Sequence, residues 1–201
     1  MIPLQCAQLC SDIYDKPELF DLIYDVGGVY VGLVRSANCD LFVFRGSCNF
    51  GDWVNDLNCE SEWDFRLGFV HSGMFSGIPM FFEWAKTVVR SDLPASFIGH
   101  SLGGAHARLA SGLFAFEGMR VSEVMTFGSP KPAGEHLMFI MLASDMVHTS
   151  YRNALDIVPT QPPDVFGYVH TEEWIQLNGK PPGGIECIED HLIANYISAL
   201  S

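Results

Sequence analysis

The sequence has 201 residues, 48% of them hydrophobic, and its 24 acidic and 11 basic side chains give a net charge of -13 at pH 7. A chain of this length and apolar content can bury a core without metal or disulfide staples, and we expect one domain over residues 1–201. The negative charge argues against nucleic acid as a partner, because phosphate contacts need Lys and Arg. It also argues against electrostatic attraction to anionic membranes.

The start of the chain, MIPLQCAQLC, lacks the basic flank and long apolar centre of a signal peptide. No apolar run reaches transmembrane length, so we expect a cytoplasmic protein, with non-classical export as the alternative. The six cysteines form no CxxC pair and no zinc-type cluster. We therefore interpret them as free thiols, with Cys6 and Cys10 packed on one helix face, and we expect no metal or other cofactor.

In the first half of the chain, the hydrophobic pattern predicts two helices and three strands. A helix is expected over residues 2–10 and another over 78–90, where a proline stands near the start. Strands are expected over 26–34 and 40–46, joined as a hairpin by Ser-Ala-Asn, and over 94–100.

The second half alternates between the two kinds of element. Helices are predicted over 102–116, 134–144 and 189–200, and strands over 121–130, 147–153 and 168–177. Alternating strands and helices are typical of an α/β domain with a largely parallel sheet, and no linker divides the chain.

One short motif, Gly-x-Ser-x-Gly, falls between the strand predicted over 94–100 and the helix that follows. Gly99, Ser101 and Gly103 form it. A strand–turn–helix context is what a nucleophile elbow requires, because the sharp turn exposes the serine hydroxyl and leaves no room for side chains beside it. The helix N-terminus also favours developing negative charge. The alternative is a glycine-rich helix start without chemistry. His100 is expected to project from the other side of the turn.

A nucleophilic serine needs a base, and the base needs an orienting acid. In this type of fold the chain order is Ser, then Asp or Glu, then His. Asp156, in a loop after a predicted strand, and His191, just before or at the start of the last helix, follow that order. Asp190 is the rival acid by proximity, and His170 is interpreted as a structural hydrogen bonder.

An oxyanion formed at such a serine needs well-aimed donors. The backbone N–H of Leu102, the residue after the nucleophile, is one candidate. Ser47, directly after the strand predicted over 40–46, is the other, with an ordinary turn serine as the alternative.

Taken together, the motifs resemble the class 3 lipases, the fungal-lipase-like branch of the α/β-hydrolases. They are FVFRGS (42–47), DWVNDL (52–57), VHSGMF (70–75), GHSLGGAHARLA (99–110), TFGSPKPAG (126–134), YRNALDIVPTQPP (151–163), GYVHTEEW (167–174) and DHLIANY (190–196). The resemblance implies an α/β-hydrolase fold and an ester hydrolase acting on acylglycerols or related lipid esters. It implies nucleophile Ser101, acid Asp156, base His191 and oxyanion donors Ser47 and Leu102.

In the family, the segment after FRGS often forms a lid. Here that segment is 48–57, and its candidates for lid contacts or acyl binding are Phe50, Trp53, Val54 and Leu57. An amphipathic helix packed on the core is an equal alternative. The chain is short for the family, and Lys131 stands where the family commonly has Arg.

The expected function is therefore hydrolysis of lipid esters through an acyl-serine intermediate, with at most transient contact with a lipid interface. A phospholipase A1 or an acyltransferase could use the same triad. A non-catalytic binding module with the hydrolase fold is the alternative of a different class. The sequence carries no signal for the oligomeric state.

Overall fold

A computed structural model describes residues 1–47, 60–170, 172–179 and 187–201 of the protein. In these ranges seven strands form one sheet in the order β1-β2-β3-β6-β7-β8-β9. The strands are β1 (Leu22–Val26), β2 (Val29–Arg35), β3 (Asp40–Phe44), β6 (Ala95–His100), β7 (Val121–Phe127), β8 (Val147–Asn153) and β9 (Ile175–Leu177). The first three strands pair antiparallel, and all later neighbours pair parallel. The predicted α/β fold with a largely parallel sheet is confirmed.

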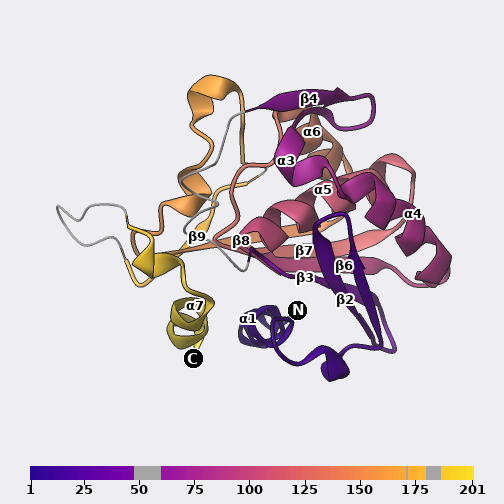
Figure 1. The fold of residues 1–201 in the computed structure, drawn as a ribbon, viewed down its shortest axis with the longest axis horizontal. Coiled ribbons are helices and arrows are strands. Elements are labelled where there is room, and N and C mark those ends of the chain that lie inside the picture. Colours follow the sequence, from indigo (N-terminus) through magenta and orange to yellow (C-terminus); the bar gives the residue numbers. More distant parts are fainter. Residues whose placement is uncertain (48–59, 171, 180–186) are drawn as a thin grey trace.

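Helices cover both faces of this sheet (Figure 1). One face carries α3 (Ser72–Phe75), α4 (Ile78–Val88), α5 (Leu102–Phe116) and α6 (Glu135–Ala143), and the other carries α1 (Pro3–Asp12) and α7 (Ile193–Leu200). A separate hairpin of β4 (Ser61–Asp64) and β5 (Gly68–His71) lies beyond α3. The described residues also include four short 3-10 turns: η1 (Pro17–Leu19), η2 (Val158–Thr160), η3 (Asp164–Phe166) and η4 (Glu189–His191).

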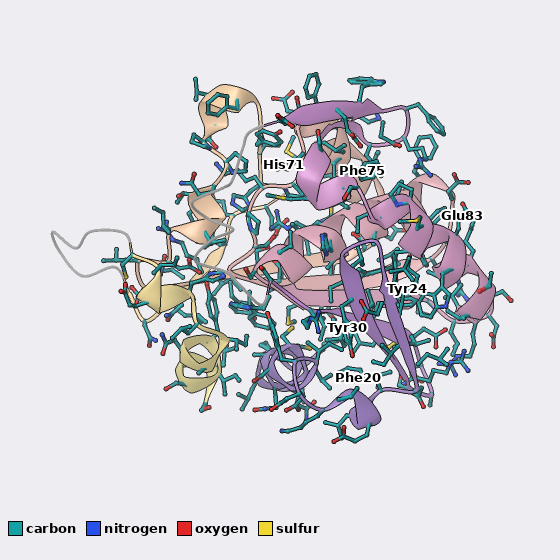
Figure 2. The ribbon with its side chains drawn as sticks, in the orientation of Figure 1. Phe20, Tyr24, Tyr30, His71, Phe75 and Glu83 are labelled. Atoms are coloured by element: carbon teal, nitrogen blue, oxygen red, sulfur yellow. The ribbon has the colours of Figure 1, made fainter. Side chains whose placement is uncertain are left out.

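Two hydrophobic cores result, because successive strand residues point to opposite faces of a sheet. Phe42 and Phe44 of β3 face α4 and α5, whereas Val43 between them faces α1. Tyr24 of β1, labelled in Figure 2, packs on Trp84 of α4, and their ring centroids are 5.0 Å apart. The sheet is therefore buried on both sides, which fixes the positions of its strand ends.

The N-terminal helix and the four described cysteines follow the prediction, whereas Cys48 and Cys59 lie outside the described residues. Cys6 and Cys10 are buried on one face of α1, and four cysteines of the described ranges are free thiols: Cys6, Cys10, Cys39 and Cys187. Burial raises the pKa of Cys6 to about 12, so this thiol packs as a small apolar group. No helix in these ranges is long and apolar enough to cross a membrane.

Two of the predicted strands and the predicted final helix need correction. The strand expected over 26–34 includes a turn, since Gly27 and Gly28 have φ of 64° and 80° and join β1 to β2. The strand expected over 168–177 contains only β9. In the rest of that stretch, His170 forms side-chain hydrogen bonds to Arg108 and to the Pro159 carbonyl. The β4–β5 hairpin was not predicted.

The final helix, expected over 189–200, is broken. Leu192 has ψ of 132°, which separates η4 from α7. His191 is thus the last residue of a tight turn, not part of the final helix.

Candidate active site

Ser101 is the single residue between β6 and α5, and its backbone has a conformation that residues other than glycine rarely adopt. Its φ is 58° and its ψ is -132°. Such a conformation costs on the order of 1–3 kcal/mol and persists only when the surroundings enforce it. Here the Ser101 N–H donates to the Phe127 carbonyl at 2.9 Å, and the Ser101 carbonyl accepts from the Gly104 N–H at 2.9 Å.

The two glycines of the motif are required by close backbone packing. A Cβ on Gly99 would lie 2.1 Å from the Gly103 carbonyl oxygen, and a Cβ on Gly103 would lie 2.2 Å from the Phe44 carbonyl oxygen. Real Cβ atoms do not come this close to backbone atoms. The turn therefore excludes side chains at both positions, as a nucleophile elbow does.

Asp156 and His191 meet as a buried pair, although 35 residues separate them. The Nδ1 atom of His191 lies 2.7 Å from Oδ2 of Asp156, and both side chains are shielded from solvent. The other carboxylate oxygen, Oδ1, accepts from the Val158 N–H at 2.9 Å. The arrangement matches an imidazole held by an orienting carboxylate.

A third side chain completes this cluster. The hydroxyl of Tyr196, a fully buried residue of α7, donates to Oδ2 of Asp156 at 2.5 Å. Burial and the nearby Asp156 charge raise the pKa of Tyr196 well above its ordinary value of 10.0. The phenol therefore keeps its proton and acts as a donor to the carboxylate.

Ser101 and His191 open onto one cavity of about 460 Å³. Its lining residues are Ser11, Tyr14, Asp15, Ser47, His100, Ser101, His191, Leu192 and Ile193. The Ser101 hydroxyl has no hydrogen-bond partner within the described ranges. Catalytic hydrogen bonds are often formed only once substrate binds, so an unpartnered serine hydroxyl on a residue that lines the cavity fits a nucleophile awaiting substrate.

The two expected oxyanion donors lie at this cavity or beside it. Leu102 is the first residue of α5, so its N–H belongs to the helix N-terminus. Ser47 lines the cavity. The turn that carries Ser47 passes close to the nucleophile, since a Cβ on Gly46 would lie 3.1 Å from the Ser101 Cβ.

The rival acid, Asp190, faces away from the imidazole. Its Oδ2 accepts from the Leu155 N–H at 3.0 Å, and its carbonyl accepts from Asn153 Nδ2 at 2.9 Å. Asp190 thereby ties η4 to the loop that carries Asp156. The candidate lid residues Phe50, Trp53, Val54 and Leu57 lie outside the described residues.

His170 is a structural residue, as predicted. Its Nε2 donates to the Pro159 carbonyl, and its Nδ1 lies 3.0 Å from the buried guanidinium of Arg108. Arg108 also pairs with Glu172 at 2.6 Å. Burial, helped by the Arg108 charge, lowers the pKa of His170 to about 3, so the ring is neutral and accepts through Nδ1.

Two features of the site were missed by sequence reasoning. Gly128 has φ of 60°, and a Cβ there would lie 2.7 Å from Asp156 Oδ2 and 2.8 Å from His191 Cε1. The sequence marks this glycine only as the end of a strand. Tyr196 gave no signal beyond an apolar helix position.

The prediction for His100 was wrong. Its ring does not project away from the site but lines the cavity and stacks on the ring of His191, with centroids 4.6 Å apart. Among the residues that the structure describes, no cluster of His, Cys, Asp or Glu could hold a metal ion.

Comparison with known proteins places this geometry in a family. The model of the family described as Lipase (class 3) matches residues 41–166, more than half of the chain and including Ser101 and Asp156. The chain belongs to the class 3 lipases. It is 30% identical over 164 residues to the secreted mono- and diacylglycerol lipase 1 of Fusarium solani, a match that covers 77% of this chain and 48% of that protein. It is 28% identical over 187 residues to the lipase of Rhizopus oryzae, covering 86% of this chain and 47% of that one.

This class 3 lipase chain therefore spans about half the length of the curated relatives it matches. Solved structures share its fold. A triacylglycerol lipase described as having a serine-protease triad aligns with a TM-score of 0.76 and 18% identity, over 94% of this chain and 91% of that one. Lipase II from Rhizopus niveus aligns with a TM-score of 0.73 and 19% identity, over 95% of this chain and 90% of that one.

The comparison overturns one expectation. A cytoplasmic location was expected because the first residues do not resemble a signal peptide. That expectation is wrong, since the relative from Fusarium solani is named a secreted lipase. The composition of the first residues is a weak guide to the compartment because it reports on one export route only.

Proposed function

We propose that the protein hydrolyses carboxylic esters of the acylglycerol class through an acyl-serine intermediate. The observation that carries the proposal is the buried Asp156–His191 pair beside a strained Ser101 that faces the same cavity. A nucleophile, a base and an orienting acid in this order are what two-step acyl transfer requires.

In the first step, Nε2 of His191 takes the proton of Ser101 while the serine oxygen attacks the ester carbonyl. The carbonyl oxygen becomes an oxyanion, which the Leu102 N–H and Ser47 stabilise from the helix end and the turn. His191 then gives its proton to the leaving alcohol, and the C–O bond breaks to leave an acyl-serine. Water, deprotonated by His191, attacks this ester and releases the fatty acid and Ser101.

Asp156 keeps the Nδ1–H tautomer of His191 in place and stabilises the imidazolium that forms in each step. It can do so because its own charge is well solvated by the protein: Val158 and Tyr196 donate to its two oxygens. A buried carboxylate without such donors would be expensive to keep ionised.

Apolar side chains on one edge of the molecule support transient contact with a lipid interface. Trp63, Phe65 and Phe69 of the β4–β5 hairpin are exposed, as are Val165 and Phe166 at η3. Exposed apolar groups gathered in this way mark interaction surfaces, and Trp in particular favours membrane–water interfaces. The relative named a secreted lipase supports action outside the cell.

The test is hydrolysis of p-nitrophenyl esters from C2 to C16 by the wild type and by Ser101→Ala. We expect turnover in the wild type and a loss on the order of 10⁶-fold in kcat in the variant, with folding retained. Ser76→Ala is the matched control, because Ser76 is exposed and does not line the cavity.

Turnover that survives in Ser101→Ala would refute the proposed nucleophile. Folded wild type that cleaves no ester, either in solution or on emulsified acylglycerol, would point to the binding module instead. The chain-length optimum separates an esterase from a lipase.

A further inference from the structure

The residue before the nucleophile, His100, makes two contacts that the proposed chemistry does not use. It is the last residue of β6 and is 6% exposed. Its Nε2 lies 2.7 Å from the backbone carbonyl oxygen of His191, across 91 residues of chain. Its ring stacks on the His191 ring, with centroids 4.6 Å apart and planes inclined by 29°.

The first contact defines the tautomer of His100. A carbonyl oxygen only accepts, so Nε2 carries the hydrogen. The other ring nitrogen, Nδ1, is buried and has no hydrogen-bond partner among the residues described. Burial and the neighbouring His191 lower the pKa of His100 well below 6.5, so the ring stays neutral. His100 is thus a donor at one defined atom and has no role as a second base.

The segment that carries His191 needs such an anchor. His191 ends η4, a turn of three residues, and Leu192 breaks the chain before α7 begins. The neighbouring residue, Asp190, is tied to the Asp156 loop through Asn153 and Leu155. Those bonds hold the turn at Asp190, whereas His100 holds the backbone of His191 itself.

The imidazole must serve two oxygens in turn, that of Ser101 and that of the leaving alcohol, while Asp156 holds its Nδ1. A ring fixed at one edge alone can still tilt about that edge. Stacking on one face and a hydrogen bond to the same residue's carbonyl remove that freedom. Misplacement of a catalytic group by about 1 Å can cost on the order of 100-fold in rate.

We propose that His100 is a positioning residue for the general base: its Nε2–H holds the carbonyl of His191 and its ring supports the His191 imidazole. This inference rests on the proposed function, in which His191 is the base. The elbow then has two roles: Ser101 is the nucleophile, and the adjacent His100 positions the base.

Three substitutions separate the two contacts. His100→Gln places an amide N–H near the position of Nε2 and removes the ring. His100→Asn carries the same amide one methylene shorter, so the donor does not reach the carbonyl. His100→Phe keeps a ring for stacking and removes the donor. His136→Gln is the control, because His136 is exposed and does not line the cavity.

The first measurement is kcat and KM for p-nitrophenyl butyrate, together with Tm. We expect His100→Asn and His100→Phe to lose about 10- to 100-fold in kcat, with KM changed by less than about threefold. His100→Gln keeps the donor but loses the stacked ring, so we expect an intermediate loss of about three- to fivefold in kcat, at a Tm similar to that of His100→Asn. Equal losses in the Gln and Asn variants, or less than a twofold loss in both Asn and Phe, would overturn the proposal.

The second measurement needs no turnover. The Nδ1 proton of His191, held against Asp156, gives a resonance that can be followed by NMR with histidine labelled at nitrogen. We expect a slowly exchanging resonance in the wild type and His100→Gln, and faster exchange in His100→Asn. That pattern without Ser101-dependent turnover would support the positioning role and refute the proposed function. Serine-dependent turnover with unchanged exchange and unchanged kcat in all three variants would refute the positioning role alone.

Discussion

The nucleophile elbow and the acid–base cluster lie beside one cavity, yet they are built in different ways. The elbow is a run of consecutive residues, and its shape comes from backbone atoms in close contact, such as Gly99 against Gly103. The acid–base cluster is assembled from side chains of distant segments: Asp156, His191 and Tyr196. Substitution of the elbow glycines should therefore cost folding, whereas substitution in the cluster should cost turnover.

Apart from the nucleophile itself, the largest expected effect lies in the cluster. Asp156→Asn keeps the size of the side chain but removes the charge that stabilises the imidazolium and the tautomer of His191. We expect kcat to fall on the order of 10⁴-fold, with the fold retained. Ester hydrolysis and circular dichroism of the same preparation measure the two quantities.

Asp190→Asn is the matched control for that change. Its amide oxygen can still accept from the Leu155 N–H, so η4 stays tied to the Asp156 loop. We expect kcat to stay within about tenfold of the wild type, because no developing charge touches this residue. A loss as large as that of Asp156→Asn would make Asp190 the acid and reverse the assignment.

The next effect lies in the elbow. Gly103→Ala would press a Cβ against the Phe44 carbonyl, where neither backbone can yield cheaply. We expect the free energy of unfolding to fall by about 3 kcal/mol, at the upper end of the range for overpacking. Urea denaturation measures it. Gly118→Ala is the control, since Gly118 has φ of 71° and no atom within 4 Å of its Cβ position, so only the strain of about 1–2 kcal/mol applies.

The elbow helix also brings a dependence of stability on pH. His106 of α5 is buried, and burial lowers its pKa from 6.5 to about 4. Between pH 6.5 and 4 the unfolded chain binds a proton at His106 and the folded chain does not. The free energy of unfolding is therefore unaffected by this group above pH 6.5 and decreases as the pH falls towards 4. The loss reaches up to about 3 kcal/mol. His106→Leu should make the free energy of unfolding less steep between pH 6.5 and 4. An unchanged slope would contradict this origin.

The smallest effect is expected for Tyr196, whose hydroxyl donates a hydrogen bond to the acid, Asp156. Tyr196→Phe removes the hydroxyl that donates to Asp156 and leaves the aromatic packing in place. A hydrogen bond to a charged group contributes about 1.5–3 kcal/mol, so kcat should fall by about 10- to 100-fold. Tyr151→Phe is the control, because Tyr151 is also buried and stacks on Phe127 without touching the site. Equal effects of the two substitutions would show that Tyr196 acts only through packing.

Elements with strong periodicity were predictable from the sequence. The helix over 102–116 and the strand over 147–153 have the expected bounds, since buried faces impose a hydrophobic repeat on the residues. The β4–β5 hairpin escaped prediction because its strands have only four residues each and β4 is mostly exposed, so burial imposes little pattern on them. The stretch before β9 looked like a strand, but the polar contacts of His170 with Arg108 hold it outside the sheet.

The sequence by itself determined the family, the α/β fold and the elbow. Each depends on patterns of neighbouring residues, such as the Gly-x-Ser-x-Gly motif between a strand and a helix. The chain order of Ser101, Asp156 and His191 also identified the candidate acid and base. Only the tertiary structure decided that the two side chains meet, that Asp190 faces elsewhere, and that His100, Gly128 and Tyr196 surround them. The physical reason is distance along the chain: these contacts join segments whose approach is set by packing on both faces of the sheet, and no local pattern records it.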